Sequence, residues 1–348
     1  VADVAGAAVG AALGVTAALL GAGPHAVVFQ VVAADAVIAV VLLRAGRGPA
    51  PNLHLRELKV LLPYGSRVMA TNGIAYFARN IDNILVGRVL GIVALSLYGM
   101  AYRVLVIPVQ MIGQTVSRVM FPAFSRVAQD KERLAGHLLT ATELLAVVTI
   151  PLMALLAASS FELVPVVLGE EWVAAAPLLT VLAVAGARET VFYVTGPLMK
   201  ATGHVKLLVR YELLATAVQV TGIVVGLLYG VVWVAVGYTA AGFLLAPVLM
   251  AIQRRLTGVG LGAQLGVIWP PLHASLWGVG AYLLLRLLDL GPILTLVAGG
   301  LAYALVLVGV LWLVHRRSSA RAWGRLRSLL PRRLGGTPAA PTAGAAAG

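Results

Sequence analysis

Three charged side chains, Arg79, Asp82 and Arg103, lie inside the long apolar stretch that runs from Pro63 to Arg126. A charge near the middle of a membrane-spanning helix costs roughly 2.5 to 3.5 kcal/mol, so each of these groups needs water or a partner. A polar cavity inside a bundle of helices supplies such surroundings. Guanidinium groups in that position can bind an anion through charge-assisted hydrogen bonds.

The spacing of polar residues indicates that two consecutive helices each carry a polar face. At about 100° per residue, one sector of the first helix holds Gly65, Asn72, Tyr76, Arg79 and Asn83. One side of the second helix holds Arg103, Gln110, Gln114 and Ser117. We expect both faces to line a cavity, because ionisable groups inside a membrane usually serve a function. The alternative is that they only join helix to helix, with Arg79 and Asp82 neutralising each other.

Further charges lie in other apolar segments. Arg188 is a candidate for binding an anionic substrate, and Glu189 follows it directly. Glu143 and Glu212 are expected to form interhelical pairs that stabilise the bundle.

The composition is that of a polytopic membrane protein. Of the 348 residues, 60% are hydrophobic and 11% are charged, and the mean hydropathy is +0.96. The absence of cysteine excludes disulfides, thiolate metal sites and a cysteine nucleophile. The sequence also lacks a P-loop, a metalloprotease helix motif and a serine-hydrolase motif, so we predict no metal and no cofactor. Because the connections between apolar segments are short, transport is favoured over catalysis.

Ten apolar segments are long enough to cross a hydrocarbon core of about 30 Å as helices, which predicts an all-α transmembrane bundle. They cover residues 1–21, 24–43, 59–86, 93–117, 138–158, 175–195, 207–229, 231–253, 264–288 and 291–314. Prolines within them, including Pro108, Pro151 and Pro247, are expected to kink or break the helices.

Basic residues alternate with these spans. They gather in the connections after spans two, four, six and eight, and in the tail at 315–348. The positive-inside rule places all of these segments in the cytoplasm. The net charge of +13 is therefore topological and does not indicate nucleic-acid binding. The arginines of the tail are expected to hold it against membrane lipids.

Several segments resemble the polysaccharide exporters of the multidrug/oligosaccharidyl-lipid/polysaccharide (MOP) flippase superfamily, which includes lipopolysaccharide biosynthesis flippases. They are RNIDNILVGRVLG at 79–91, LYGMAYR at 97–103 and RVMFPAFSR at 118–126. A fourth, FELVPVVLGEEW at 161–172, resembles the outer loop of the colanic acid and teichuronic acid exporter branch. The likeness covers most of residues 24–315.

The resemblance implies two six-helix lobes around a central cavity, as in MATE-like transporters, followed by two further helices. It assigns 1–43 to the end of the first lobe, 44–58 to a cytoplasmic linker, and 59–253 to the second lobe. Residues 254–314 would be the two further helices, and 315–348 a basic, largely disordered tail. About four helices of the first lobe would be missing, and the start at Val1 without a methionine also suggests an N-terminally incomplete chain.

The resemblance also implies a function at the cell inner membrane. The substrate would be an undecaprenyl-diphosphate-linked oligosaccharide, moved from the cytoplasmic to the outer leaflet by alternating access. Arg79, Arg103 and Arg188 would hold the diphosphate, Asn72, Gln110 and Gln114 would meet sugar hydroxyls, and Asp82 and Asn83 would complete the cavity lining. Polysaccharide polymerase and glycosyltransferases are expected as partners.

Two alternative functions remain open. A MATE-like transporter for drugs or cations would favour an acidic and aromatic cavity, whereas the predicted polar faces are basic and rich in amides. The alternative among enzymes is a membrane glycosyltransferase or polymerase. The short connections between the apolar segments disfavour it.

Overall fold

The computed structural model describes residues 2–45 and 80–316, and the chain divides into two compact units, 1–73 and 74–348. All regular secondary structure in the described ranges is helical, which confirms the predicted all-α bundle. Eight helical segments in these ranges are long and apolar enough to cross a membrane. The chain is therefore a multi-pass membrane protein. Of the predicted span at 59–86, residues 59–79 lie outside the described ranges.

The described part of the first unit is a helical hairpin, α1 (Ala2–Leu19) and α2 (His25–Ala45). The buried residues of α1 are three glycines spaced four residues apart, Gly6, Gly10 and Gly14. A Cβ placed on Gly10 would lie 2.6 Å from the carbonyl oxygen of Gln30 in α2. Small residues at this spacing let the two helix backbones approach closely, as in many membrane helix pairs.

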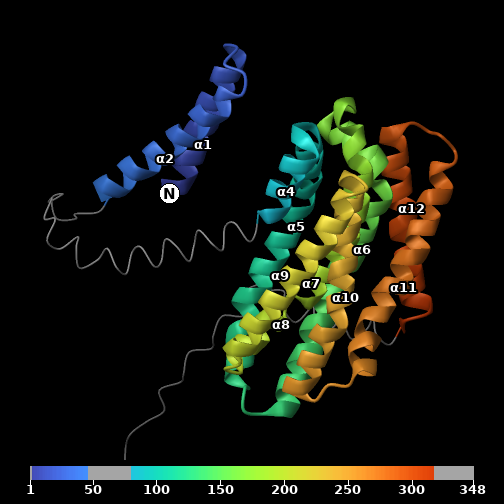
Figure 1. Cartoon of the computed structure of the whole chain (residues 1–348). Coiled ribbons are helices and arrows are strands. Elements are labelled where there is room, and N and C mark those ends of the chain that lie inside the picture. The colour runs from blue at the N-terminus through green and yellow to red at the C-terminus, as the bar shows by residue number, and fades with distance from the viewer. Residues whose placement is uncertain (1, 46–79, 317–348) are drawn as a thin grey trace, which may run out of the picture. The chain divides into compact units, whose positions relative to one another are not determined.

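The described part of the second unit is a helical bundle. Its elements are α4 (Ile81–Val89), α5 (Gly91–Arg126), α6 (Lys131–Leu168), the short 3₁₀ helix η1 (Glu170–Ala175), α7 (Ala176–Phe192), α8 (Thr195–Ala201), α9 (Val205–Leu227), α10 (Val231–Thr257), α11 (Leu261–Arg286) and α12 (Pro292–Leu313). Helices α6, α7 and α10 form the middle, with α5 and α9 on one side and α11 and α12 on the other (Figure 1).

The helices are interrupted at glycine and at turns rather than at the predicted prolines. Helices α5, α6 and α10 continue through Pro108, Pro151 and Pro247. One interruption precedes Gly91, whose φ of 87° favours glycine because an L side chain rarely adopts it. Another separates α7 from α8, where Gln253 of α10 donates a 2.7 Å hydrogen bond to the Thr195 hydroxyl.

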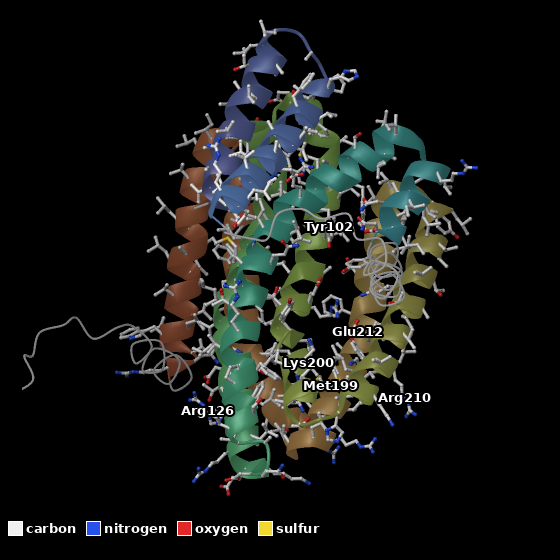
Figure 2. All side chains as sticks on the ribbon, turned by 90° about the vertical axis from the view of Figure 1, so that its left-hand side faces the viewer. Tyr102, Arg126, Met199, Lys200, Arg210 and Glu212 are labelled. Carbon is white, nitrogen blue, oxygen red and sulfur yellow. The ribbon has the colours of Figure 1, made fainter. Side chains whose placement is uncertain are left out.

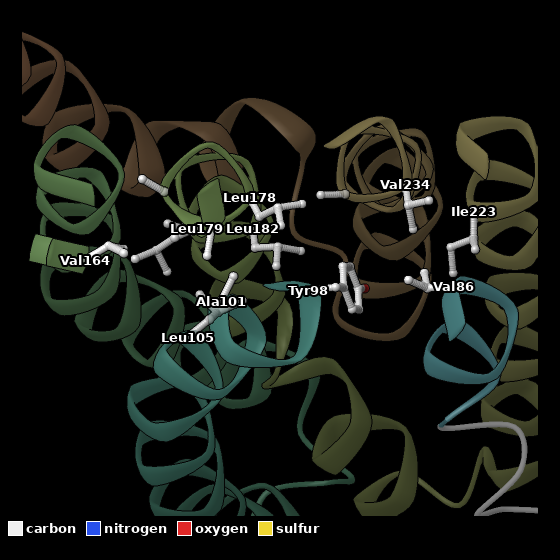
Figure 3. Packing of buried hydrophobic residues seen from close by; sticks show 14 of the residues in the cluster. Val86, Tyr98, Ala101, Leu105, Val164, Leu178, Leu179, Leu182, Ile223 and Val234 are labelled. Atoms are coloured by element: carbon white, nitrogen blue, oxygen red, sulfur yellow. The ribbon is translucent and has the colours of Figure 1, made fainter. Parts of the chain in front are cut away.

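The largest hydrophobic core of the bundle centres on α7 (Figure 3). Leu178, Leu179 and Leu182 are fully buried there and pack with residues of α5, α6, α9 and α10. Lipid tails are as apolar as leucine, so removal from the solvent contributes little to helix association within a membrane. The core stabilises the bundle mainly through close packing.

Helices α9 and α10 touch backbone to backbone at Gly222 and Gly237. A Cβ placed on Gly237 would overlap the carbonyl oxygen of Gly222, and a Cβ on Gly226 would overlap that of Trp233. The crossing therefore depends on the absence of side chains at these positions.

We expect Gly237→Ala to lower the free energy of unfolding by about 1–3 kcal/mol, because the added methyl group forces α9 and α10 apart. Gly280→Ala is the matched control, since a Cβ there meets nothing within 4 Å. Thermal unfolding of the purified full-length protein in detergent measures both. Equal stability of the two variants would contradict the tight crossing.

Two tyrosines fix α11 and α12 to each other and to α6. Tyr282 packs over Gly299 and Tyr303 over Gly278, so each helix supplies a notch for the other's ring. The Tyr303 hydroxyl donates to the carbonyl oxygen of Pro151 at 2.8 Å.

A partly buried ion pair links α6 to α11. The Arg286 Nε lies 2.8 Å from Glu162 Oε1, and the Tyr282 hydroxyl donates to Glu162 Oε2 at 3.2 Å. The Arg286 guanidinium also lies 4.9 Å from the ring centroid of Phe161. The segment 161–172, which the resemblance assigned to an outer loop, thus begins as the last two turns of α6 and ends in η1.

Replacing Arg286 by methionine should lower the free energy of unfolding by about 1.5–3 kcal/mol, because the buried Glu162 carboxylate loses a charged donor. Arg133→Met is the matched control, since Arg133 pairs with Asp130 at 3.2 Å on the surface. Exposed pairs contribute at most about 1 kcal/mol. Losses of equal size, measured by thermal unfolding, would show that the Arg286–Glu162 pair contributes no more than the surface pair.

Candidate functional site

Two residues of the polar face predicted for α5 have described side chains. Arg103 and Gln110 are both exposed, with Ile107 between them 57% exposed. Gln114 lies further along α5, but its side chain is not among those that the structure describes. Asn72 and Arg79 of the other predicted face lie outside the described residues, so their roles remain predictions.

Asp82 is directed into the bundle. It is 9% exposed and accepts a 3.1 Å hydrogen bond from the Tyr98 hydroxyl of α5. Its other carboxylate oxygen accepts from the backbone N–H of Asn83 at 2.8 Å, and Asn83 itself is half-buried. In this arrangement Asp82 joins α4 to α5 and lies apart from the exposed face that carries Arg103.

Aromatic residues extend the surroundings of Asp82 into an acidic cluster. Tyr102 stacks on Tyr98 with ring centroids 6.3 Å apart. The Tyr238 hydroxyl of α10 donates to Glu189 Oε2 at 3.4 Å. These tyrosines were not among the site residues predicted from the sequence. Their signal was the four-residue spacing of Tyr98 and Tyr102, because a phenol inside a span needs a hydrogen-bond partner.

Arg188 is buried between α7 and α10. It is 9% exposed, and its guanidinium occupies a notch at Gly242, where a Cβ would lie 2.7 Å from Nη2. Its Nε has no hydrogen-bond partner within the described residues.

The same arginine borders an apolar cavity of about 490 Å³ between α6, α7, α10 and α11. Alanine, valine, leucine, isoleucine and phenylalanine side chains form most of its wall, and Arg286 also lines it. A cavity with this lining suits an apolar chain, while Arg188 offers one cation to an acidic group.

A second set of charged residues lies on the side of the bundle formed by α5, α8 and α9. Figure 2 shows Lys200 of α8 and Arg210 and Glu212 of α9 on this side of the bundle. Glu212 is exposed and forms no ion pair within the described residues, unlike the interhelical pair expected for it. Glu143 is 5% exposed on α6.

Residues 1–177 match the protein family described as "Polysaccharide biosynthesis protein". The chain belongs to this family. Among curated relatives in the polysaccharide biosynthesis family, the teichuronic acid biosynthesis protein TuaB of Bacillus subtilis (strain 168) is 30% identical over 236 residues. That match covers 63% of this chain and 49% of TuaB.

A second relative is the lipopolysaccharide biosynthesis protein WzxC of Escherichia coli (strain K12), which is 28% identical over 234 residues, or 65% of this chain and 47% of WzxC. The chain thus spans about half the length of these curated relatives. The lipid II flippase MurJ in its inward closed conformation superposes with a TM-score of 0.69 over 90% of this chain and 67% of MurJ, at 13% identity. The chain shares the MurJ fold. The family match and these relatives confirm the predicted resemblance to polysaccharide exporters.

Tyr98→Phe should lower the free energy of unfolding by about 1–3 kcal/mol, because the buried Asp82 carboxylate loses its side-chain donor. Tyr229→Phe is a suitable control, since Tyr229 is 69% exposed. Both are measured by thermal unfolding, alongside surface polymer in cells that carry each variant. Unchanged stability with loss of polymer would show that Asp82 serves transport rather than folding.

Proposed function

We propose that the full-length protein is a flippase for undecaprenyl-diphosphate-linked oligosaccharide in the cell inner membrane. Membership of the polysaccharide biosynthesis family carries this proposal. The shared fold with MurJ supports it, since MurJ is a flippase for lipid II. The protein acts as a transporter and not as an enzyme in this account.

Arg103 and Arg79 attract the diphosphate, while Gln110, Gln114 and Asn72 meet sugar hydroxyls. Seven residues of helix separate Arg103 from Gln110, a rise of about 10.5 Å. This distance lets one residue contact the diphosphate while the other contacts the first sugars. The exposure of both side chains on one face of α5 supports these roles.

Arg188 and the neighbouring apolar cavity add a place for the lipid part of such a substrate. The cavity accepts an apolar chain, and the Nε of Arg188, which has no hydrogen-bond partner among the described residues, offers a donor at its wall. An amphiphile with an acidic head and an apolar tail therefore fits both kinds of surface in this bundle.

Movement of two lobes exposes the substrate first to the cytoplasmic side and then to the outer side. Residues 59–253 form the second lobe and 254–314 two additional helices, while 1–43 belong to the first lobe. The alternation of basic connections places the C-terminal tail in the cytoplasm. There the substrate arrives from glycosyltransferases, and a polymerase uses it on the outer side.

A MATE-like exporter of drugs or cations is the second candidate. The cluster of Asp82, Glu189, Tyr98, Tyr102 and Tyr238 favours it, because acidic and aromatic groups suit a cation. Within the bundle, Asp82 already accepts a hydrogen bond from the Tyr98 hydroxyl, and Glu189 accepts one from the Tyr238 hydroxyl.

Arg103→Gln in the full-length protein should slow flipping of lipid-linked oligosaccharide in proteoliposomes by about 10- to 100-fold, because a hydrogen bond to a charged group contributes roughly 1.5–3 kcal/mol. Arg255→Gln, an exposed arginine near the end of α10, is the control. Flipping at the wild-type rate by Arg103→Gln would remove Arg103 from the site. Drug-stimulated cation uptake without lipid flipping would favour the second candidate.

A further inference from the structure

Two histidines join the end of α12 to the middle of α11. His315 Nε2 lies 3.2 Å from His273 Nδ1. On the other side of its ring, His273 Nε2 accepts a 3.1 Å hydrogen bond from the indole N–H of Trp277. Because an indole nitrogen can only donate, neutral His273 carries its proton on Nδ1 and donates it to His315. The pair therefore fixes where the last residues of α12 lie.

Exposed tryptophans surround this histidine pair. The ring of Trp269 stacks on His273 with centroids 5.7 Å apart, and Trp312 precedes His315 by three residues. Trp269, Trp277 and Trp312 are each more than half exposed. Tryptophan gathers at the headgroup level of a bilayer, because its ring is apolar and its N–H group is polar. We therefore expect the membrane surface at the last turn of α12, a helix long and apolar enough to span the membrane.

One face of α12 is apolar up to this level and basic beyond it. Four exposed residues follow one another at intervals of four, three and four positions and so share this face: Leu301, Leu305, Val308 and Trp312. Arg316 comes four positions later, is exposed, and holds its guanidinium 5.7 Å from the ring centroid of Trp312. Neither α11 nor α12 contains an acidic residue. An amphiphile with an apolar chain and an acidic head matches this order of side chains.

We infer that Arg316 binds the phosphate of an anionic phospholipid whose acyl chain lies along this face of α12. A guanidinium group can bind two phosphate oxygens at once through charge-assisted hydrogen bonds. The positive-inside rule assigns this end of α12 to the cytoplasmic side, where anionic lipids give the leaflet its negative surface potential. The inference does not depend on the transported substrate, so its failure would leave the proposed function standing.

Two other ligands fit this end of α12 less well. A transition metal between the histidines needs the lone pair of His273 Nδ1, which would move the ring proton to Nε2, against the Trp277 donor. A zwitterionic phospholipid brings an ammonium group to a surface that lacks a carboxylate on either helix.

The test measures which lipid lies beside Trp312 in the full-length protein. A reporter variant keeps Trp312 and has phenylalanine at every other tryptophan. Its fluorescence is recorded in mixed micelles with phosphatidylglycerol or phosphatidylcholine brominated near the headgroup end of the acyl chain. Because bromine quenches a nearby indole, the quenching gives the relative affinity of the two lipids. We expect about a tenfold preference for phosphatidylglycerol, falling below threefold in Arg316→Gln, which loses a charge-assisted hydrogen bond. Arg316→Lys keeps the positive charge and should retain most of the preference.

Two controls separate a site from a general attraction to basic surfaces. Arg255→Gln removes another exposed arginine, at the end of α10, and should change the preference less than twofold. A second reporter keeps only Trp233, which is 54% exposed at the start of α10 in a stretch, 211–253, without lysine or arginine, and it should show no preference. Size-exclusion chromatography checks that each variant is monodisperse. No preference at Trp312, an equal preference at Trp233, or equal losses in Arg316→Gln and Arg255→Gln would each overturn the inference.

Discussion

Lipid removes the usual reason for apolar side chains to associate, and this constraint governs the whole bundle. Lipid is as apolar as leucine, so burying a leucine between two helices gains little free energy. Helices are therefore held together where their backbones approach closely or where polar groups pair. The α9–α10 crossing at Gly222 and Gly237 is an example of the first kind. The Tyr303 hydroxyl on the Pro151 carbonyl and the Arg286–Glu162 pair are examples of the second.

The same constraint separates structural charges from candidate functional ones. Asp82 and Glu162 are buried, and each accepts hydrogen bonds from groups of a neighbouring helix, so they contribute to folding. Arg103 and Glu212 are exposed within helices that are long and apolar enough to span a membrane. Because lipid cannot solvate them, they need water or a polar ligand.

Much of the fold could be predicted from the sequence, because span length and hydropathy set where helices cross a membrane. The partners of single residues could not. Periodicity places Asp82 and Asn83 on a helix, but only the bundle shows that Asp82 accepts a hydrogen bond from Tyr98, sixteen residues away. Glu212 was expected to pair between helices but forms no ion pair within the described residues, while Glu162 pairs with Arg286, over a hundred positions later. Pairings of that kind depend on how helices pack, which a single sequence does not specify.

The central claim is that the full-length protein moves a lipid-linked oligosaccharide between leaflets. The most direct measurement depletes it in its own cells and quantifies that lipid on each leaflet of the inner membrane. The account predicts accumulation on the cytoplasmic leaflet with loss of the surface polymer. An unchanged distribution between leaflets, together with new sensitivity to drugs, would contradict it and favour efflux.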